Sequence, residues 1–415
     1  VQERRAALGD ERFESWQRQY NRPVVLYVPL HGEEDKPSEP ERCTHAIRFF
    51  AGDDLWVRWP FTRRSSAREA LTSIDPFGPV CPCAGLSQLN TSRSKDMRES
   101  KNYWMYESAQ RILSELRPRV YWGENAPALA GKVGTFMKEK LFNIGQKNGY
   151  NMSIYLTKSL QHGGPQYRKR TFYFFWNKEK FGDRIPTFKY YNKPRPTIED
   201  LIGGVNSNFQ NEVLNKKIPS KDDPYYRFML EVAKGGITHR EYVDSLTEEK
   251  SVNVESKLIK SGYTYLEIAK WMDGFGEVFE REAARARRKD AKLKTGGGVM
   301  LRGTIVPKSY IGAFVVHLPK SVTHPTEDRY LNFAEMKAIM GLPNDMELLD
   351  PETNYNHICQ NVPYYVAKDM ATEVKAVLEN KRDMIRTNYL FQNNLNQKIE
   401  YHQDLNNLDP HLKVA

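Results

Sequence analysis

Apolar and polar positions alternate along the first part of the chain in a way that predicts both strands and helices. Apolar residues recur at helical spacing over 103–116 and 133–148, and these runs stop at Pro118 and Gly149. A further helix is predicted over 4–20. Short continuous apolar runs predict buried strands at 24–28, 120–122, 154–157 and 171–176. This alternation indicates an α/β fold with a mostly parallel sheet.

The pattern changes after Trp176. Residues 180–200 are rich in proline and aromatic residues, 204–294 are polar and mainly helical, and Thr295 to Gly298 form a flexible break before a strand-like stretch over 299–316. Helices over 329–341 and 363–380 return to the first domain. The polar tail after Phe391 is expected to be a loosely docked helix. The expected domains are 1–180 with 300–391, an inserted and mainly helical 181–299, and a tail over 392–415.

Composition and charge narrow the class of protein. The 415 residues are 40% hydrophobic and carry a net charge of +10, from 62 basic and 52 acidic residues, which suits a polyanionic partner without proving one. No run approaches the roughly 20 apolar residues of a membrane span, so no membrane partner is expected. The N-terminus is charged from Glu3 onward and shows no secretion signal, so we expect a cytoplasmic or nuclear location.

Cysteine usage points to a reducing compartment. Four cysteines are too few for a disulfide scaffold. Cys81 and Cys83 form a Cys-x-Cys pair with no second pair nearby, so no metal site is expected.

Three short segments stand at the ends of successive predicted strands. They are Gly78 to Ser87, which contains Pro82 and Cys83; Glu124-Asn125-Ala126-Pro127; and Gly164-Pro165-Gln166-Tyr167-Arg168-Lys169-Arg170. Ligand sites in open α/β sheets lie outside the carboxyl ends of the strands. The three segments are therefore expected to meet at one site.

In this order the segments resemble the signature of the DNA cytosine-5 methyltransferases: Pro-Cys with a Gly-x-Ser loop, then Glu-Asn, then Gln-x-Arg-x-Arg. Downstream, Arg329-Tyr330-Leu331-Asn332, Glu335 and Gly341-Leu342-Pro343 look like the family's Arg-x-Leu-Thr…Glu…Gly-Phe-Pro segment. Residues 355–363 look like its final motif. The resemblance covers about 45–180 and 300–380. It implies a Rossmann-like S-adenosylmethionine-dependent methyltransferase domain, with 181–299 as an inserted target-recognition domain, in an enzyme of the restriction-modification type.

The resemblance assigns chemical roles. Carbon 5 of cytosine becomes nucleophilic once a thiolate adds to carbon 6, and Cys83 takes this role. Glu124 is the acid facing N3 of the base, and Arg168 and Arg170 suit its O2 edge and nearby phosphates. The open alternatives are a buried structural thiol at Cys83, Cys81 as the nucleophile, a solvated helix cap at Glu124, and an ordinary charged edge strand carrying the two arginines.

Double-stranded DNA is the expected partner, with the target base flipped into the pocket. Residues expected to contact DNA are Ser87, Arg93, Arg98, Gln166, Arg285 and Arg288. The first three belong to a loop over 84–100 that would close over the base. The last two belong to the basic run 281–294, whose alternative is a solvated helix face. Residues 258–271 weakly resemble a helix-turn-helix with a recognition helix starting near Thr264, a pattern that any two packed helices also give.

S-adenosylmethionine is the expected cofactor, yet the family's Phe-x-Gly-x-Gly turn is not found. The expected cofactor contacts are Asp53, Asp54, Pro82, Asn125 and Gln360. Either the turn lies upstream of Val1 or the chain lacks it; we expect a monomer, or else a partner subunit that supplies the turn. Two rival functions stay open: a catalytically silent DNA-binding relative, and an enzyme that modifies carbon 5 with a different one-carbon donor, which Cys359-Gln360 in place of the usual Gly-Asn permits.

Overall fold

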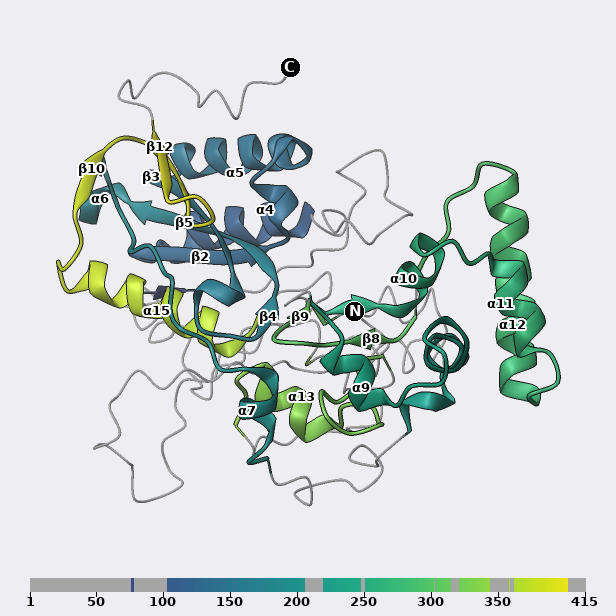
Figure 1. The fold of residues 1–415 in the computed structure, drawn as a ribbon. Helices are drawn as coiled ribbons and strands as arrows, with labels where there is room; N and C mark the ends of the chain where they lie inside the picture. Colours follow the sequence, from purple (N-terminus) through teal and green to yellow (C-terminus); the bar gives the residue numbers. More distant parts are fainter. Residues whose placement is uncertain are drawn as a thin grey trace, which may run out of the picture.

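The centre of the molecule is a mixed sheet. The computed structural model describes residues 76–77, 103–205, 219–247, 251–301, 303–314, 321–343, 358 and 362–401. Within them, one sheet has the strand order β1-β2-β5-β3-β11-β12 (Figure 1). These strands are β1 Pro76–Phe77, β2 Val120–Asn125, β3 Tyr150–Lys158, β5 Lys169–Asn177, β11 Tyr389–Asn393 and β12 Lys398–Tyr401. Helices cover this sheet, which confirms the expected Rossmann-like α/β class.

The strand directions differ from the expectation of a mostly parallel sheet. β1 is parallel to β2, and β3 is parallel to β11, but β5 runs antiparallel to both β2 and β3. β12 is antiparallel to β11. The cause is the short connection between β3 and β5 over 159–168. A parallel pair needs a crossover of a dozen or more residues, usually a helix, whereas an antiparallel pair closes over a short loop.

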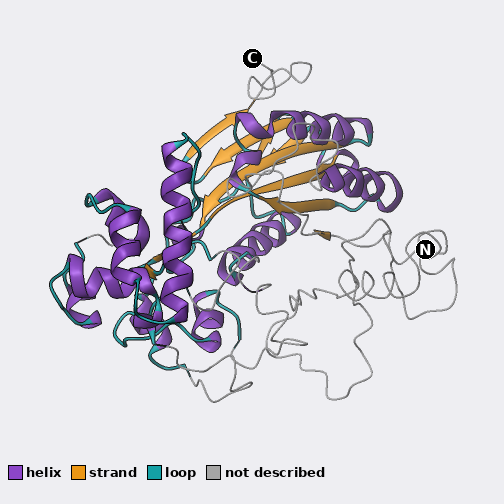
Figure 2. Cartoon of the chain, turned by 90° about the vertical axis from the view of Figure 1, so that its right-hand side faces the viewer, coloured by secondary structure: helices purple, strands orange, loops and turns teal. Residues whose placement is uncertain are grey.

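Helices pack on both faces of the sheet (Figure 2). On one face lie α4 Tyr103–Arg111, continued by a π-helical turn Ile112–Leu116, and α5 Thr135–Lys147. On the other lies α15 Tyr364–Leu378. Side chains of β5 pack on both faces of the sheet, because successive side chains of a strand point to opposite sides. Tyr173 and Phe175 pack in the cluster with α4 and α5, while Phe172, Phe174 and Trp176 pack in the cluster with α15. These helices and strands lie where the apolar pattern predicts them.

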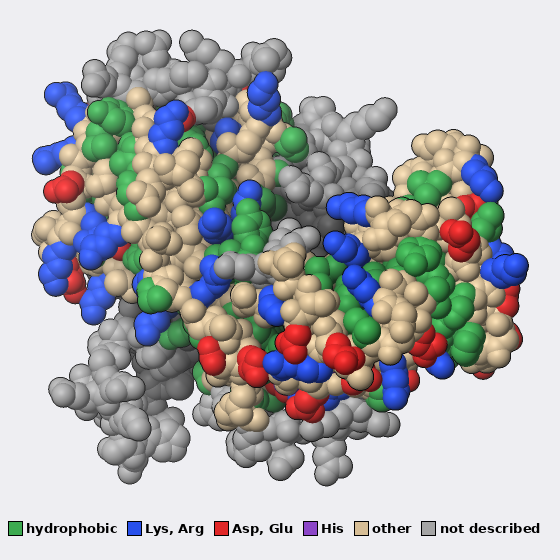
Figure 3. Space-filling model, viewed as in Figure 1, with side chains coloured by type: hydrophobic (Ala, Val, Ile, Leu, Met, Phe, Trp, Pro, Cys, Tyr) green, Lys and Arg blue, Asp and Glu red, His purple; other side chains and the backbone are tan. Residues whose placement is uncertain are grey.

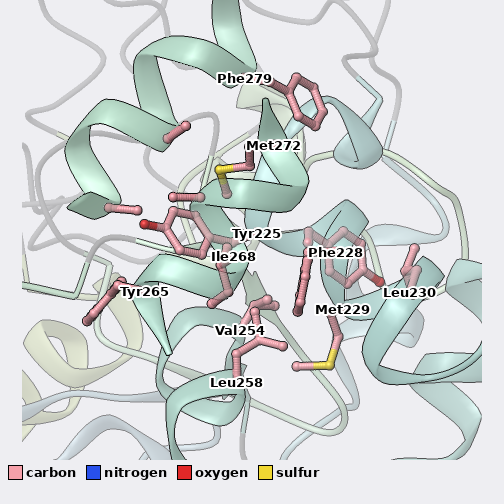
Figure 4. Packing of buried hydrophobic residues seen from close by; sticks show 14 of the residues in the cluster. Tyr225, Phe228, Met229, Leu230, Val254, Leu258, Tyr265, Ile268, Met272 and Phe279 are labelled. Carbon is pink, nitrogen blue, oxygen red and sulfur yellow. The ribbon is translucent and has the colours of Figure 1, made fainter. Parts of the chain in front are cut away.

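A second core holds the helical region together. Its helices are α8 Pro224–Phe228 with a π-helical turn Met229–Ala233, α9 His239–Asp244, α10 Val254–Lys260, α11 Tyr265–Met272 and α12 Glu277–Lys294. Their buried side chains point toward one another, as Figure 4 shows for Ile268 and Met272 beside Tyr225. α10 and α11 confirm the two helices predicted over 258–271. Thr264 and Glu267 form a reciprocal capping box that fixes the start of α11.

Short elements connect the two regions. They are β4 Gln166–Tyr167, which pairs with β9 Ile311–Gly312; α6 Lys178–Phe181; β6 Arg184–Pro186, which pairs with β10 Met384–Arg386; α7 Ile198–Ile202; β7 Val252–Asn253, which pairs with β8 Ile305–Val306; and α13 Phe333–Ile339. Of the strand-like stretch expected over 299–316, the residues that the structure describes form two short strands, β8 and β9.

Over the described part of the C-terminal tail, residues 392–401, the expected helix is wrong. The segment after Phe391 continues β11 and then forms β12. Its amides are buried and bonded: Gln392 donates to the Phe188 carbonyl at 2.6 Å and accepts from the Phe188 N–H at 2.9 Å. Asn394 accepts from the Tyr191 N–H at 2.8 Å. The polar composition thus serves long-range pairing rather than solvation.

The helix predicted over 4–20 and the strand over 24–28 lie outside the described residues. Among the helices that the structure describes, none is long and apolar enough to cross a membrane.

Candidate active site

The structure describes about half of the predicted site. Glu124, Asn125, Gln166, Arg168, Arg170, Arg285 and Arg288 are described. Cys83, Ser87, Arg93, Arg98, Asp53, Asp54, Pro82 and Gln360 lie outside the described residues, as does Cys81.

Sheet register brings the second and third predicted segments together. Opposite Glu124 at the end of β2 stands Phe172, and Thr171 stands opposite Asn125. Arg170 is the next residue of β5, so it projects just beyond the end of β2. β1 is parallel to β2, with Pro76 and Phe77 opposite Val120 and Tyr121, so both strands run toward this same edge. Arg170 is on β5, which lies between β2 and β3 in the sheet, and Arg168 is in the segment that precedes β5, so the alternative of an ordinary edge strand carrying both arginines is wrong.

Glu124 is a buried carboxyl between two arginines. Its exposed fraction is 7%, which excludes the solvated helix cap. Arg170 Nε lies 2.6 Å from Glu124 Oε1, without hydrogen-bond geometry, so Oε1 has no hydrogen-bond donor among the described residues. Burial raises the pKa of Glu124 above its ordinary value, and the charges of Arg170 and Arg168 oppose this rise only in part. The carboxyl is thus suited to carry a proton and donate it to a ligand.

Gln166 and Arg168 belong to the segment that precedes β5. Arg168 is buried and donates from Nη1 to the Phe314 carbonyl at 2.8 Å. The Gln166 side chain is fully buried, with Nε2 3.3 Å from the sulfur of Met340. Its Oε1 is buried without a hydrogen-bond partner in the part of the chain that the structure describes. An acceptor left in this state costs about 1–3 kcal/mol, which a donor on a ligand would recover.

Ser159 is a site residue that sequence reasoning missed. Its hydroxyl donates to the Gln166 carbonyl at 2.5 Å and accepts from the Arg168 N–H at 3.0 Å. No local pattern marks this serine, since it stands at the other end of the β3–β5 connection. It fixes the backbone from which the Gln166 and Arg168 side chains project.

Asn125 shapes the turn that ends β2. The side chain is fully buried, and its Oδ1 accepts from the Ala126 N–H at 2.9 Å. Its Nδ2 lies 3.6 Å from the sulfur of Met105. In the residues that the structure describes, no group of three or more His, Cys, Asp or Glu side chains is placed to hold a metal ion.

Arg285 and Arg288 lie on α12, with exposed side chains. Both line a groove of about 480 Å³, together with Lys289, Lys292, Asp223, Tyr225, Glu255, Glu282, Val299, Met300 and Gly303. Arg285 forms an ion pair with Glu282, and Lys289 forms one with the buried Glu255. The groove is therefore of mixed charge, which the basic run alone does not predict. Figure 3 shows a group of Lys and Arg side chains on the flank of the helical region nearest the sheet.

Comparisons with known proteins identify a matching family. A family model described as C-5 cytosine-specific DNA methylase matches residues 63–376. The type II methyltransferase M.FnuDI of Fusobacterium nucleatum is 25% identical over 149 residues, which are 35% of this chain and 42% of that protein. The match thus spans less than half of that relative.

Similar solved structures include two methyltransferases. One is a DNA modification methyltransferase encoded within a prophage of E. coli, with 16% identity, a TM-score of 0.42, and coverage of 77% of this chain and 84% of that chain. The other is the methyltransferase EhMeth of Entamoeba histolytica, with 14% identity, a TM-score of 0.39, and coverage of 74% and 82%.

Proposed function

The chain belongs to the C-5 cytosine-specific DNA methylase family, and from this premise we propose that it transfers a methyl group to carbon 5 of a cytosine in double-stranded DNA. One observation carries the proposal. The buried carboxyl of Glu124 meets Arg170 and the charge of Arg168 at the sheet edge toward which β1, parallel to β2, also runs. The Pro82-Cys83 pair follows β1 by a few residues in the sequence.

The chemistry needs a nucleophile and an acid on one base. The Cys83 thiolate forms a bond from sulfur to carbon 6. The electron pair of the carbon 5–carbon 6 double bond forms a carbon 4–carbon 5 double bond, and the pair of the carbon 4–N3 double bond moves to N3, which takes the proton of Glu124. Carbon 5 is then enamine-like and takes the methyl group, while the carbon 4–N3 double bond re-forms and N3 returns its proton to Glu124. A base removes the carbon 5 proton, the electron pair of that bond re-forms the carbon 5–carbon 6 double bond, and the thiolate leaves. The raised pKa of Glu124 supports its role as the proton donor.

S-adenosylmethionine, when bound, supplies the methyl group. The residues proposed to hold it are Asp53, Asp54, Pro82 and Gln360, together with the turn at Asn125. Of these, only Asn125 is described, and its carboxamide is engaged by Ala126 and Met105. Its part in binding is therefore to fix the backbone after β2.

We assign DNA contacts to two surfaces. At the base, Arg168 and Arg170 would face the O2 edge and adjacent phosphates, and Gln166 would offer its Oε1, which has no hydrogen-bond partner among the described residues. On the helical region, residues 181–299, Arg285 and Arg288 line the groove beside α12 and would contact phosphates. Loop residues Ser87, Arg93 and Arg98 would close over the flipped base.

Covalent trapping tests the proposal. Duplex DNA carrying 5-fluorocytosine is incubated with the full chain and S-adenosylmethionine, and the adduct is resolved on a denaturing gel. We expect an adduct with the wild-type chain and with Cys81→Ser, but none with Cys83→Ser. Circular dichroism establishes that both variants fold.

Other outcomes select the rivals. An adduct with Cys83→Ser but not with Cys81→Ser moves the nucleophile to Cys81. DNA binding without any adduct, and without measurable binding of S-adenosylmethionine in a titration, indicates a silent DNA-binding relative. An adduct that forms only when another one-carbon donor is present indicates different C5 chemistry.

A further inference from the structure

One face of α15 lies against the loop that carries Gln166 and Arg168. Tyr365, Asp369 and Glu373 are spaced four residues apart, so they stand above one another on the same side of this helix. Tyr365 and Asp369 reach the 159–164 segment, whereas Glu373 reaches a different one, over 189–191. The two contacts with the 159–164 segment involve no residue assigned so far to the reaction.

Asp369 anchors the loop through a buried histidine. Its Oδ2 accepts from His162 Nδ1 at 2.9 Å, and its Oδ1 pairs with Lys193 Nζ at 2.6 Å. The other ring nitrogen of His162 lies 2.8 Å from the hydroxyl of Thr157 on β3. Asn394 donates to that same hydroxyl at 3.0 Å. In the neutral His162 ring, Nδ1–H donates to the Asp369 carboxylate and Nε2 accepts from the Thr157 hydroxyl. Each group from Asn394 through Thr157 and His162 to Asp369 therefore donates to the next.

Tyr365 holds the loop by packing its ring against Gly164. Its ring lies directly on the α-carbon of Gly164 and leaves no room for a side chain there. The same ring packs on Gly341, whose φ of +72° already favours glycine. Its hydroxyl donates to the Ile339 carbonyl at the end of α13, at 2.8 Å.

The anchored loop sets the position of the reactive segment. Gly164 N–H donates to the Ser159 carbonyl at 3.2 Å, and His162 N–H donates to the same carbonyl at 3.0 Å. The Ser159 hydroxyl then holds both Gln166 and Arg168 by their backbones. A shift of His162 or Gly164 therefore passes through Ser159 to Arg168 and its contact with the Phe314 carbonyl.

We propose that Asp369, through His162, and Tyr365, through Gly164, are positioning residues that hold Gln166 and Arg168 in register with Glu124. The catalytic part of this inference rests on the proposed function. Misplacing a reactive group by about 1 Å can cost on the order of 100-fold in rate. In this proposal Asp369 and Tyr365 act through the loop, by their contacts with His162 and Gly164.

Asp369→Asn tests the inference, with Glu373→Gln as the matched control. Both change a buried carboxylate on one face of α15, but Glu373 pairs with Arg382 and Tyr191 instead of the loop. We expect Asp369→Asn to lower kcat for methyl transfer on the order of 10- to 100-fold, with a smaller change in KM for DNA, because the loop at the base shifts while the α12 groove is untouched. Glu373→Gln should lower the melting temperature while keeping kcat.

Hydrogen exchange supplies a readout that needs no activity. In the full-length chain, Asp369→Asn should speed amide exchange in the peptide spanning 159–168, and Glu373→Gln should speed it over 188–192 instead. A wild-type chain without methylation would refute the proposed function, while the exchange result would still decide the positioning role. Unchanged exchange over 159–168 in Asp369→Asn overturns the inference, as does equal loss of kcat in both variants.

A double-mutant cycle tests the Tyr365 contact separately. Gly164→Ala should push the ring aside and reduce kcat, and Tyr365→Ala should reduce it by freeing the loop. The combined variant has space for the new methyl group, so its kcat should exceed the product of the two single effects. Effects that simply multiply would show that ring and loop act independently.

Discussion

Glu124→Gln separates proton donation from every other role of this side chain. The amide keeps the size of the carboxyl and can still donate a hydrogen bond to N3, but it cannot give up a proton there. General acid catalysis contributes on the order of 10²–10⁴ in rate, equivalent to about 2.7–5.4 kcal/mol of barrier at 1.36 kcal/mol per tenfold. We expect methyl transfer to slow by that factor while DNA affinity is retained.

The raised pKa of Glu124 also determines how Glu124→Gln should change the stability of the folded chain. Because burial raises the pKa of Glu124 in spite of Arg170 and Arg168, the folded chain binds this proton more tightly than the unfolded chain does. Wild-type stability therefore falls as the pH rises above the ordinary pKa of 4.5, until the carboxyl is ionised in the folded state as well. At neutral pH, Glu124→Gln removes this penalty and should not lower the melting temperature.

Glu373→Gln is the contrasting case. Burial opposes ionisation of Glu373, but hydrogen bonds from Arg382, Tyr191 and the Lys189 N–H together lower its pKa. Its folded state prefers the charged form, so this variant should lose stability at neutral pH. The two buried glutamates thus differ in which charge state the fold favours.

Single-turnover transfer of a labelled methyl group into duplex DNA, followed from pH 5 to 9, is the assay. Wild-type activity should fall as the pH rises through the pKa of Glu124, and the Gln variant should lack that limb. A Gln variant with wild-type rates, or one that loses rate only in proportion to lost folded protein, would refute the role of Glu124 as proton donor.

Three further outcomes are expected elsewhere. Arg288→Gln should weaken DNA binding and reduce the slope of log affinity against log salt by about 1, measured by fluorescence anisotropy. Thr264→Ala removes the capping box of α11 and should cost about 1 kcal/mol in urea unfolding. His324→Asn should make stability less sensitive to acid. His324 Nδ1 accepts from the N–H groups of Thr326 and Glu327, and burial, aided by Arg329, lowers its pKa to about 4.

The lowered pKa of His324 makes the folded protein less stable in acid. The unfolded ring gains a proton below its ordinary pKa of 6.5 and the folded ring only near 4, so wild-type stability is full above 6.5 and falls between these values. The loss is on the order of 2 kcal/mol, allowing for solvent screening. Asn can accept the same backbone bonds without titrating.

Each of these outcomes has a contradicting result. A wild-type acid profile in His324→Asn would contradict the histidine prediction. Arg240→Gln is the control for Arg288→Gln, since Arg240 is exposed and paired with Asp244 outside the α12 groove. Equal slopes of log affinity against log salt in the two variants would show that α12 is a solvated helix face that does not contact DNA. For Thr264→Ala, unchanged stability would mean that packing alone sets the start of α11.

The sequence predicts the helices and strands better than their arrangement. The apolar runs at β2 and β5 are short but continuous, so their local pattern is decisive. The antiparallel direction of β5 follows from the length of its connection to β3. The polar stretch around Gln392 and Asn394 misleads because a buried amide and a solvated amide look alike in sequence. Only their distant partners, Phe188 and Tyr191, distinguish the two.

In the candidate site, too, the sequence predicts some residues, while others depend on contacts with distant parts of the chain. Motif order brings Glu124, Arg168 and Arg170 to one edge, since strand ends converge in an α/β sheet. The residues that hold them, Ser159 and Tyr365, belong to no recognisable pattern. A helix residue that packs on a glycine far along the chain leaves no periodic signal.

The place of β11 in the sheet has a consequence for how this protein is made. β11 pairs with β3, and Asn394 bonds Thr157 across 237 residues of sequence. During synthesis, β3 and β5 leave the ribosome long before the strand that borders them, so a row of backbone groups on β3 stays exposed until β11 is made. Such non-local pairing slows folding and leaves an unfinished edge prone to association. Conditions that delay the end of translation should therefore favour aggregation of this chain over its completion.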